Sequence, residues 1–261
     1  MKTIKLKIDG IETEAEDRTT ILSIAQRLGI KIPNLCHHPL LEPYGVCRIC
    51  TVEVKSGTRT RMVTACNYPA TNGIEVLTNS PRVRRNRKMI VEWMMAQCGH
   101  VKILKDMAAE YDISKPRFGR GTDDCILCGL CVRVCSDVVG ANVLGFFNRG
   151  ATREVSTAFG ETSEKCIACG ACAWICPTTH LKMENEKLER FRTLPGSERL
   201  CRYSLMGVTK GALCANSFQC WKCEVEQRFH DQLQTHPIFL GRSRKIKEID
   251  AYVSQLNEMR G

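Results

Sequence analysis

The spacing of the cysteines limits what this chain can fold into more than any other feature of its sequence. Seventeen of its 261 residues are cysteine, and most of them stand in tight C-x-x-C runs. A disulfide framework this dense is typical of short secreted domains. The Met1 end, however, alternates lysine with apolar residues and lacks the continuous apolar segment of an export signal. The sequence therefore predicts metal–thiolate sites in a cytoplasmic protein.

The strongest signal is a run of four cysteines that occurs twice between residues 121 and 181. Both copies have the spacing C-x2-C-x2-C-x3-C, in which three cysteines bind one 4Fe–4S cluster and the fourth reaches its neighbour. Two separate zinc sites would not explain this arrangement. The expected ligands are Cys125, Cys128, Cys131 and Cys176 for the first cluster, and Cys166, Cys169, Cys172 and Cys135 for the second. Pro177 follows the second copy, whereas Ser136 follows the first.

A third set of cysteines near the amino terminus has the spacing C-x10-C-x2-C-x15-C. Plant-type ferredoxins have a shorter first gap. The segments 35–39, 45–54 and 64–66 (LCHHP, GVCRICTVEV and TAC) instead resemble the 2Fe–2S domain of the large iron–sulfur subunit of complex I. They also resemble its relatives in NAD-linked hydrogenases and formate dehydrogenases. The resemblance covers about residues 1–181 and implies one 2Fe–2S cluster, bound by Cys36, Cys47, Cys50 and Cys66.

Three histidines near these sites are not expected to be ligands. A Rieske centre would replace two cysteines by histidine, but all four cysteines of the amino-terminal set are present, so His37 and His38 are interpreted as loop or packing residues. The related subunits usually carry a further 4Fe–4S cluster held by one histidine and three cysteines. The corresponding segment here offers only Cys98 and His100, so we expect that cluster to be absent and Cys98 to be a buried thiol.

The carboxy-terminal part holds a fourth set of cysteines, with the spacing C-x12-C-x5-C-x2-C. A 4Fe–4S cluster and a structural zinc ion both remain possible occupants, and a site without metal is a third alternative. The nearby His230 and His236 could substitute as ligands but are not needed beside four cysteines. The candidate metal ligands are Cys201, Cys214, Cys220 and Cys223.

The pattern of apolar residues predicts an α+β protein with a β-grasp sheet. Strands are expected at 3–9 and 11–16, joined by a turn at Asp9-Gly10, and later at 49–54 and 74–78. A helix between them would be capped by Thr19 or Thr20 and end at Gly29. The expected domains are a 2Fe–2S ferredoxin-like domain (1–80), a basic helical connector (81–120, helical to about 111), a double 4Fe–4S ferredoxin domain (121–181) and a cysteine-rich metal-binding extension (182–261) with a final amphipathic helix at 245–259.

The net charge of +10 is less suggestive of nucleic-acid binding than it first appears. Each oxidised cluster with four thiolates carries a charge of about −2, so three clusters would lower the total to about +4. Residues 81–120 hold ten basic and four acidic side chains. These basic residues either form a solvated helical face or provide a docking surface for an acidic partner.

The sequence signals no substrate site of its own. It has no G-x-G-x-x-G after a predicted strand, no phosphate-binding loop and no apolar stretch long enough to cross a membrane. The leading hypothesis is an electron-transfer subunit that relays electrons between a flavin- and NAD(P)H-binding subunit and a catalytic subunit of the hydrogenase or formate dehydrogenase type. The alternatives are a succinate/fumarate-type iron–sulfur subunit, a free-standing polyferredoxin and a zinc-dependent nucleic-acid binder. The first normally has a shorter 2Fe–2S gap and a 3Fe–4S site, and the last ignores the eight cysteines of the duplicated run.

Overall fold

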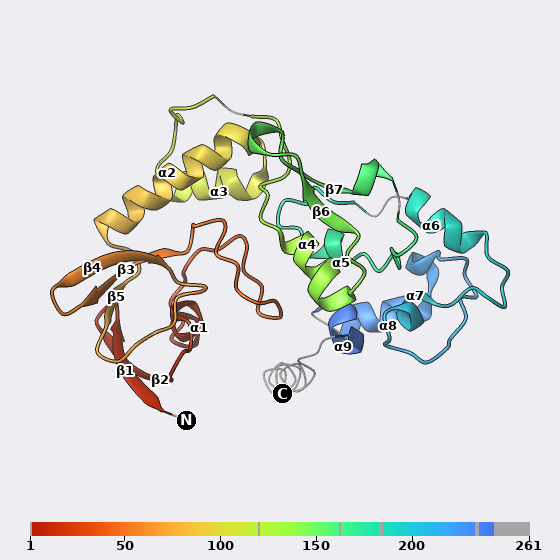
Figure 1. Cartoon of the computed structure of the whole chain (residues 1–261), viewed down its shortest axis with the longest axis horizontal. Helices are drawn as coiled ribbons and strands as arrows, with labels where there is room; N and C mark the ends of the chain where they lie inside the picture. The colour runs from red at the N-terminus through yellow and green to blue at the C-terminus, as the bar shows by residue number, and fades with distance from the viewer. Residues whose placement is uncertain (1, 120, 162, 183–184, 233–234, 243–261) are drawn as a thin grey trace. The chain divides into compact units, whose positions relative to one another are not determined.

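The computed structural model describes residues 2–119, 121–161, 163–182, 185–232 and 235–242 (Figure 1). The chain divides into two compact units, Met1–Cys128 and Gly129–Gly261. The helix expected at 245–259 lies outside the described residues. The elements of the first unit are β1 (Thr3–Ile8), β2 (Ile11–Glu16), α1 (Ile21–Arg27), β3 (Thr51–Ser56), β4 (Arg59–Thr64), β5 (Glu75–Leu77), α2 (Pro81–Cys98) and α3 (Lys102–Glu110).

The first unit is built on a five-stranded sheet in the order β2-β1-β5-β3-β4. Strands β1 and β5 run parallel, and the other neighbours are antiparallel. The predicted hairpin is confirmed, because Asp9 and Gly10 adopt left-handed φ values of 48° and 84° between β1 and β2. Strand β4 was not predicted, since its first three residues are exposed and its sequence lacks a clear apolar alternation.

The core of this unit lies between the sheet and α1. Ile4, Leu6 and Ile8 alternate with exposed lysines along β1, and the apolar face of α1 packs against them. The helix begins where the hydroxyl of Thr20 accepts a hydrogen bond from the Ser23 amide (3.3 Å). Each fully buried Ile or Leu stabilises such a core by about 1.5–3 kcal/mol. Cys50 and Cys66 belong to the same apolar cluster, so the core also fixes two of the cysteines.

Helices α2 and α3 form the connector that the sequence predicts, with a break at Gly99. Ser80 caps α2 by accepting the Val83 amide (3.3 Å), and its hydroxyl donates to Glu53 on β3 (2.6 Å). Arg87 is only 3% exposed and donates to the carbonyl of Thr51 (2.9 Å). The helix is therefore tied to the sheet by polar contacts near its amino-terminal end.

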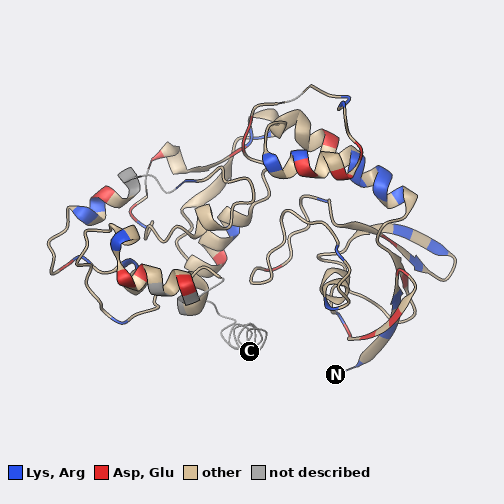
Figure 2. Ribbon diagram, turned by 180° about the vertical axis from the view of Figure 1, so that it is seen from behind, with Lys and Arg blue, Asp and Glu red and all other residues tan. Residues whose placement is uncertain are grey.

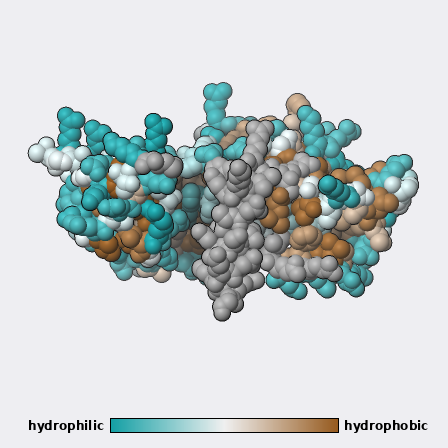
Figure 3. Space-filling model, turned by 90° about the horizontal axis from the view of Figure 1, so that it is seen from below, coloured by the Kyte–Doolittle hydropathy of each residue, from teal (hydrophilic) through white to brown (hydrophobic). Residues whose placement is uncertain are grey.

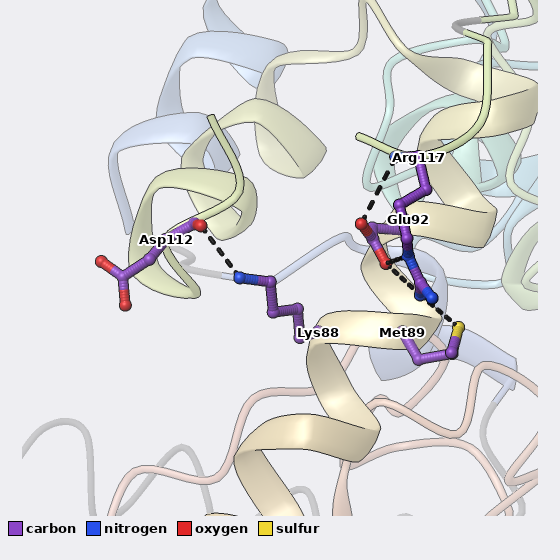
Figure 4. A network of polar contacts seen from close by, with 5 residues as sticks. All are labelled: Lys88, Met89, Glu92, Asp112 and Arg117. Carbon is purple, nitrogen blue, oxygen red and sulfur yellow. Dashed lines mark hydrogen bonds and ion pairs between the residues drawn. The ribbon is translucent and has the colours of Figure 1, made fainter. Parts of the chain in front are cut away.

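Many of the basic side chains of the connector form hydrogen bonds or ion pairs within the first unit. Figure 2 shows acidic residues among the basic ones along the ribbons of α2 and α3. Lys88 donates to the carbonyl of Asp112 (3.0 Å), and Arg117 donates from Nε (3.0 Å) and Nη2 (2.5 Å) to the Glu92 carboxylate (Figure 4). The pKa of Glu92 is lowered, chiefly because Arg117 hydrogen bonds to its charged form. These contacts fasten the loop after α3 onto α2.

The second unit consists of short elements joined by long loops. Strands β6 and β7 form a hairpin, and Ile238 and Phe239 at the start of α9 are fully buried. Its elements are α4 (Leu130–Arg133), the π-helix η1 (Val134–Val139), β6 (Leu144–Phe147), η2 (Gly150–Thr152), β7 (Glu154–Thr157), η3 (Ala158–Gly160), α5 (Ala171–Trp174), α6 (Asn185–Arg192), α7 (Arg202–Leu205), η4 (Cys220–Lys222), α8 (Glu224–Gln232) and α9 (Ile238–Arg242).

Hydrophobic side chains are visible on the surface of the second unit in the view of Figure 3. Its exposed large apolar residues include Phe159 (97% exposed) and Trp221 (64%). Among the helices within the described ranges, none combines the length and apolar character that a membrane span requires.

Candidate metal centres

All seventeen cysteines lie in the described residues, and none of them forms a disulfide bond. Over the same residues, no three His, Cys, Asp or Glu side chains converge as closely as the ligands of a single metal ion. Some of the thiols contact one another in pairs, some accept hydrogen bonds from backbone amides, and some line a common pocket. These features decide how far each predicted set fits an iron–sulfur cluster.

The amino-terminal set forms two thiol pairs. Cys36 lies in the loop after α1, Cys47 and Cys50 precede β3, and Cys66 follows β4. Side-chain hydrogen bonds join Cys36 with Cys47 and Cys50 with Cys66. The four thiols are also close enough for their charges to interact across the pairs. Each iron of a 2Fe–2S cluster needs two protein thiolates, so two adjacent pairs fit this group.

Backbone amides surround the thiol of Cys36. The amide of Cys47 donates to its sulfur (3.4 Å), and the amides of Val46 and Gly45 also favour the thiolate. The hydrogen bond with Cys47 and these amides outweigh burial and lower the pKa of Cys36 to about 6. Gly45 has a φ of 71°, and a Cβ there would stand 2.6 Å from Nδ2 of Asn67. The loop can curl around the sulfur because this residue is glycine.

Cys50 shows the same effect in the other pair. Its hydrogen bond with Cys66 is the largest contribution, and together with the amides of Cys66 and Ala65 it lowers the pKa of Cys50 to about 7. The same hydrogen bonds, together with burial, raise the pKa of the partner thiols Cys47 and Cys66. One thiol of each pair therefore favours the thiolate, which is the form that binds metal. His38 is occupied locally, since its Nδ1 accepts the amide of Leu40 (3.3 Å).

The second set of the duplicated run lies entirely in the second unit. Cys135, Cys166, Cys169 and Cys172 line one pocket, and the rest of its wall is mostly apolar. The amide of Val143 donates to the sulfur of Cys135 (3.4 Å). Burial raises the pKa of Cys172 to about 11, and the neighbouring thiols contribute to this rise. Four thiols that line one mostly apolar pocket fit a 4Fe–4S cluster, which is larger than a single metal ion.

The duplication extends to the backbone conformation of the two runs. Leu127 and Ala168 occupy equivalent positions and are both left-handed, with φ values of 53° and 49°. Gly129 and Gly170 follow with φ values of 74° and 77° and begin α4 and α5. Left-handed residues are costly unless their surroundings fix them. Their recurrence shows that both runs form the same type of loop.

The two runs differ after their fourth cysteine, and the sequence explains why. Pro177 follows Cys176 and lacks the amide that would continue the helix, so α5 ends at Trp174. Ser136 has no such restriction, and the chain continues from α4 into the π-helix η1, which contains Cys135. The hydroxyl of Ser136 donates to the carbonyl of Arg133 (3.2 Å). The residue after the fourth cysteine therefore explains why the helix continues in the first run and ends in the second.

The remaining set of the duplicated run is divided between the units. Cys125 and Cys128 belong to the first unit, whereas Cys131 and Cys176 belong to the second. The amide of Leu127 donates to the sulfur of Cys125 (3.4 Å). Burial alone would raise the pKa of Cys176, but the hydroxyl of Thr178 and nearby backbone amides lower it. Both thiols thus receive the donors that a bound thiolate needs.

Cys98 and His100 are each engaged elsewhere. Cys98 is fully buried, as predicted, and its thiol donates to the carbonyl of Cys125 (3.2 Å). Burial, with the nearby acidic groups, raises its pKa to about 12. His100 is exposed and pairs with Asp124 (2.6 Å). Both residues help to anchor the segment that leads into the first run.

The tail cysteines Cys201, Cys214, Cys220 and Cys223 also line one pocket. The two nearby histidines do not line it. Nε2 of His236 hydrogen bonds to the carbonyl of Cys169 (3.0 Å), and His230 is exposed beside Asp231. Sequence reasoning missed Arg202, which lies against both Cys169 and this pocket. Only its position directly after Cys201 could have drawn attention to it.

Comparison with known protein families identifies two iron–sulfur domains in this chain. Residues 1–81 match the model of the 2Fe-2S iron-sulfur cluster binding domain, and residues 124–180 match that of the 4Fe-4S dicluster domain. The chain therefore combines a 2Fe–2S domain with a 4Fe–4S dicluster domain, as electron-transfer proteins do. The predicted α+β fold class is confirmed.

The similar proteins found by sequence are subunits of oxidoreductases. The chain is 33% identical over 179 residues to the NADPH-Fe(3+) oxidoreductase subunit alpha of Geobacter sulfurreducens, covering 59% of this chain and 21% of that protein. It is 30% identical over 179 residues to the NADH-ubiquinone oxidoreductase 75 kDa subunit of Reclinomonas americana, covering 59% of this chain and 26% of that protein. The chain thus spans about a fifth to a quarter of these relatives.

A solved structure of an oxidoreductase is also similar to this chain. A chain of an NAD+-reducing [NiFe]-hydrogenase in the H2-reduced state superposes with a TM-score of 0.51 at 25% identity, covering 61% of this chain and 79% of that one. The predicted resemblance to the amino-terminal region of the complex I subunit and to NAD-linked hydrogenases is confirmed. The chain is related to the iron–sulfur electron-transfer subunits of multi-subunit oxidoreductases.

Proposed function

We propose that this chain is the electron-transfer subunit of a cytoplasmic multi-subunit oxidoreductase. It would relay electrons between a flavin- and NAD(P)H-binding subunit and a catalytic subunit of the hydrogenase or formate dehydrogenase type. The observation that carries the proposal is that twelve cysteines stand in cluster-binding order within the two matched domains. Iron–sulfur clusters supply one-electron transfer when bound.

The proposed ligands follow the sets described above. The 2Fe–2S cluster would be held by Cys36, Cys47, Cys50 and Cys66, the first 4Fe–4S cluster by Cys125, Cys128, Cys131 and Cys176, and the second by Cys166, Cys169, Cys172 and Cys135. Amides that donate to the sulfurs stabilise the thiolate form, and the apolar pocket around the second set limits access of water. The protein thereby supports the insulation and the potential of each centre.

The surface near the 2Fe–2S set is suited to contact with a partner. Tyr44 and Val46 are 43% and 44% exposed, although Cys47 beside them is only 6% exposed. An aromatic and an aliphatic side chain next to a buried ligand provide an apolar contact close to the electron carrier. The names of two relatives include NADPH or NADH, which favours a nicotinamide-linked donor or acceptor on this side.

Anaerobic purification of the native assembly, followed by mass spectrometry of the co-purified chains, tests the proposal. We expect a flavoprotein and a catalytic oxidoreductase subunit in stoichiometric amounts. Recovery of the chain alone would favour a free-standing polyferredoxin. Recovery with a flavoprotein that oxidises a dicarboxylate would favour the succinate/fumarate alternative.

The ligands are tested separately by Cys50→Ser in the full chain. This variant should lose about two irons and the 2Fe–2S signal in electron paramagnetic resonance (EPR) spectra, while the 4Fe–4S signals remain. Cys98→Ser is the matched control, because a serine hydroxyl can still donate to the carbonyl of Cys125. An unchanged iron content in Cys50→Ser would contradict the assignment.

A further inference from the structure

The first two cysteines of the tail are brought side by side by backbone pairing. An antiparallel bridge between Leu200 and Leu213 joins the two segments that lead into Cys201 and Cys214. Within it, the amide of Cys201 donates to the carbonyl of Ala212 (2.8 Å), and the amide of Cys214 donates to the carbonyl of Arg199 (2.7 Å). Two thiols that lie far apart in the sequence therefore start from neighbouring points of the backbone.

A tight turn brings in the second pair. Ser217 and Phe218 are both left-handed, with φ values of 46° and 58°, and the Phe218 amide donates to the sulfur of Cys214 (3.2 Å). The amide of Cys223 then donates to the carbonyl of Cys220 (2.9 Å) and closes a short turn. Two successive left-handed residues carry a backbone cost that the surroundings must support. Here the strained turn directs an amide at a thiol.

Arg199 holds this turn in place. Its Nη1 donates to the hydroxyl of Ser217 (2.9 Å), and its Nη2 donates to the carbonyls of Arg192 (3.0 Å) and Leu194 (2.7 Å). The guanidinium thus connects the turn to the end of α6. The arrangement of the four thiols around their common pocket is therefore supported from outside the pocket.

The tail pocket repeats a device found in the other thiol sets of this chain. Each set includes a sulfur that accepts a hydrogen bond from a backbone amide: Cys36 from Cys47, Cys125 from Leu127, Cys135 from Val143 and Cys214 from Phe218. Such donors stabilise a metal-bound thiolate. Structural zinc sites are usually built from two close pairs of ligands. The tail set has one close pair and two distant members, as the 2Fe–2S set of this chain does.

Arg202 connects this pocket to the second set of the duplicated run. Its Nε donates to the carbonyl of Cys169 (3.1 Å), and its Nη2 makes a second bond to the same oxygen. The guanidinium also reaches the thiol of Cys220 and forms an ion pair with Glu226 (3.8 Å). One cationic side chain therefore contacts members of two thiol sets.

We propose that Cys201, Cys214, Cys220 and Cys223 bind a fourth iron–sulfur cluster, and that Arg202 couples it electrostatically to the cluster at Cys169. A second centre one side chain away from the first extends the relay by one step. The coupling rests on the 4Fe–4S site proposed above for Cys135, Cys166, Cys169 and Cys172. The existence of the fourth cluster does not depend on that site.

Metal analysis of the full chain, purified without oxygen, is the first test. Three clusters account for about 10 irons per chain, and a fourth raises the total to about 14 for a 4Fe–4S centre or about 12 for a 2Fe–2S centre. Either of the higher totals supports the proposal. About 10 irons with one zinc, or with no further metal, would overturn it.

Cys220→Ser locates the additional iron. We expect it to lose two to four irons relative to the wild type while the EPR signals of the other three clusters persist, and Cys98→Ser should lose none. Equal iron in Cys220→Ser and the wild type would refute the site even if the variant folds well. Absence of the duplicated-run signals from the wild type itself would instead refute the proposed function. If Cys220→Ser does not fold, the iron content of the wild type still tests whether a fourth cluster is present.

Redox titration of Arg202→Gln tests the coupling. Removal of the positive charge should shift two midpoint potentials, those of the fourth cluster and of the cluster at Cys169, to more negative values. Arg202→Lys keeps the charge and should restore both potentials most of the way. A shift in only one potential, or none, would overturn the role of Arg202, because a purely structural role would lower cluster content without moving two potentials together.

Discussion

Gly121 lies where the chain returns to the end of α2, and an alanine there would have no room. An ideal Cβ would stand 2.1 Å from the carbonyl oxygen of Gln97 and 2.5 Å from that of Ala96. Both are backbone atoms of a helix, so no side chain can rotate away to relieve the contact. The segment must move outward by at least about 1.3 Å to reach an ordinary van der Waals distance of 3.4 Å.

That movement would break the backbone hydrogen bonds that hold the segment. The Gly121 amide donates to Met95 (3.2 Å), the Gly99 amide donates to Gly121 (3.0 Å), and the Asp123 amide donates to Gln97 (3.0 Å). Each such bond contributes about 1 kcal/mol. Gly121→Ala should therefore destabilise the first unit by about 3 kcal/mol, which corresponds to a fall in Tm of roughly 10 °C for a unit of this size.

Thermal unfolding followed by circular dichroism without oxygen measures this effect. Gly119→Ala is a matched control two residues away, because a Cβ there meets nothing within 4 Å. Its Tm should stay within about 2 °C of the wild type. Since Gly121 precedes Cys125 by four residues, Gly121→Ala should also lose iron first from the cluster at Cys125. Equal midpoints for the two alanine variants would refute the steric argument.

Three further results are expected. Gly45→Ala combines a left-handed φ with a contact to Asn67, so it should reduce 2Fe–2S content, measured by EPR, more than 4Fe–4S content. Ser136→Pro removes an amide inside η1 and should lower iron by about four per chain, whereas Ser136→Ala should not. Glu92→Gln should lower the midpoint of urea unfolding at pH 7. Because Arg117 lowers the pKa of Glu92, this difference should be present above the ordinary carboxyl range and disappear as the pH falls through the lowered pKa; a difference independent of pH would contradict the ion pair.

Local signals made much of the first unit predictable. The Asp9-Gly10 turn, the Thr20 cap and the alternation of β1 each act within a few residues, and all three appear in the structure. Strand β4 escaped prediction because its pairing with β3, not its own exposed side chains, makes it a strand. Helix α6 was missed because its segment is highly polar.

The two iron–sulfur domains could be predicted because cluster ligation imposes spacing on the sequence, whereas the assignment of individual cysteines to clusters stays a prediction. The residues that support the cysteines could not be predicted, since they act across long separations. Arg202 is 33 residues from Cys169, and His236 is 67 residues from it. Such contacts leave no periodic trace in a single sequence. The π-helix had a weak local signal in the missing proline at Ser136, but its helix type depends on packing.

The different closure of the two duplicated runs has a consequence for the potentials of the two proposed clusters. Cys176 receives a hydroxyl and several amides after a proline turn, whereas Cys135 receives the amide of Val143 beside a π-helix. Hydrogen bonds to the sulfurs raise the potential of a cluster. Two carriers with identical ligands therefore need not be isoenergetic. We therefore expect the two proposed clusters to have different midpoint potentials, so that the duplicated module would be a step between unequal carriers.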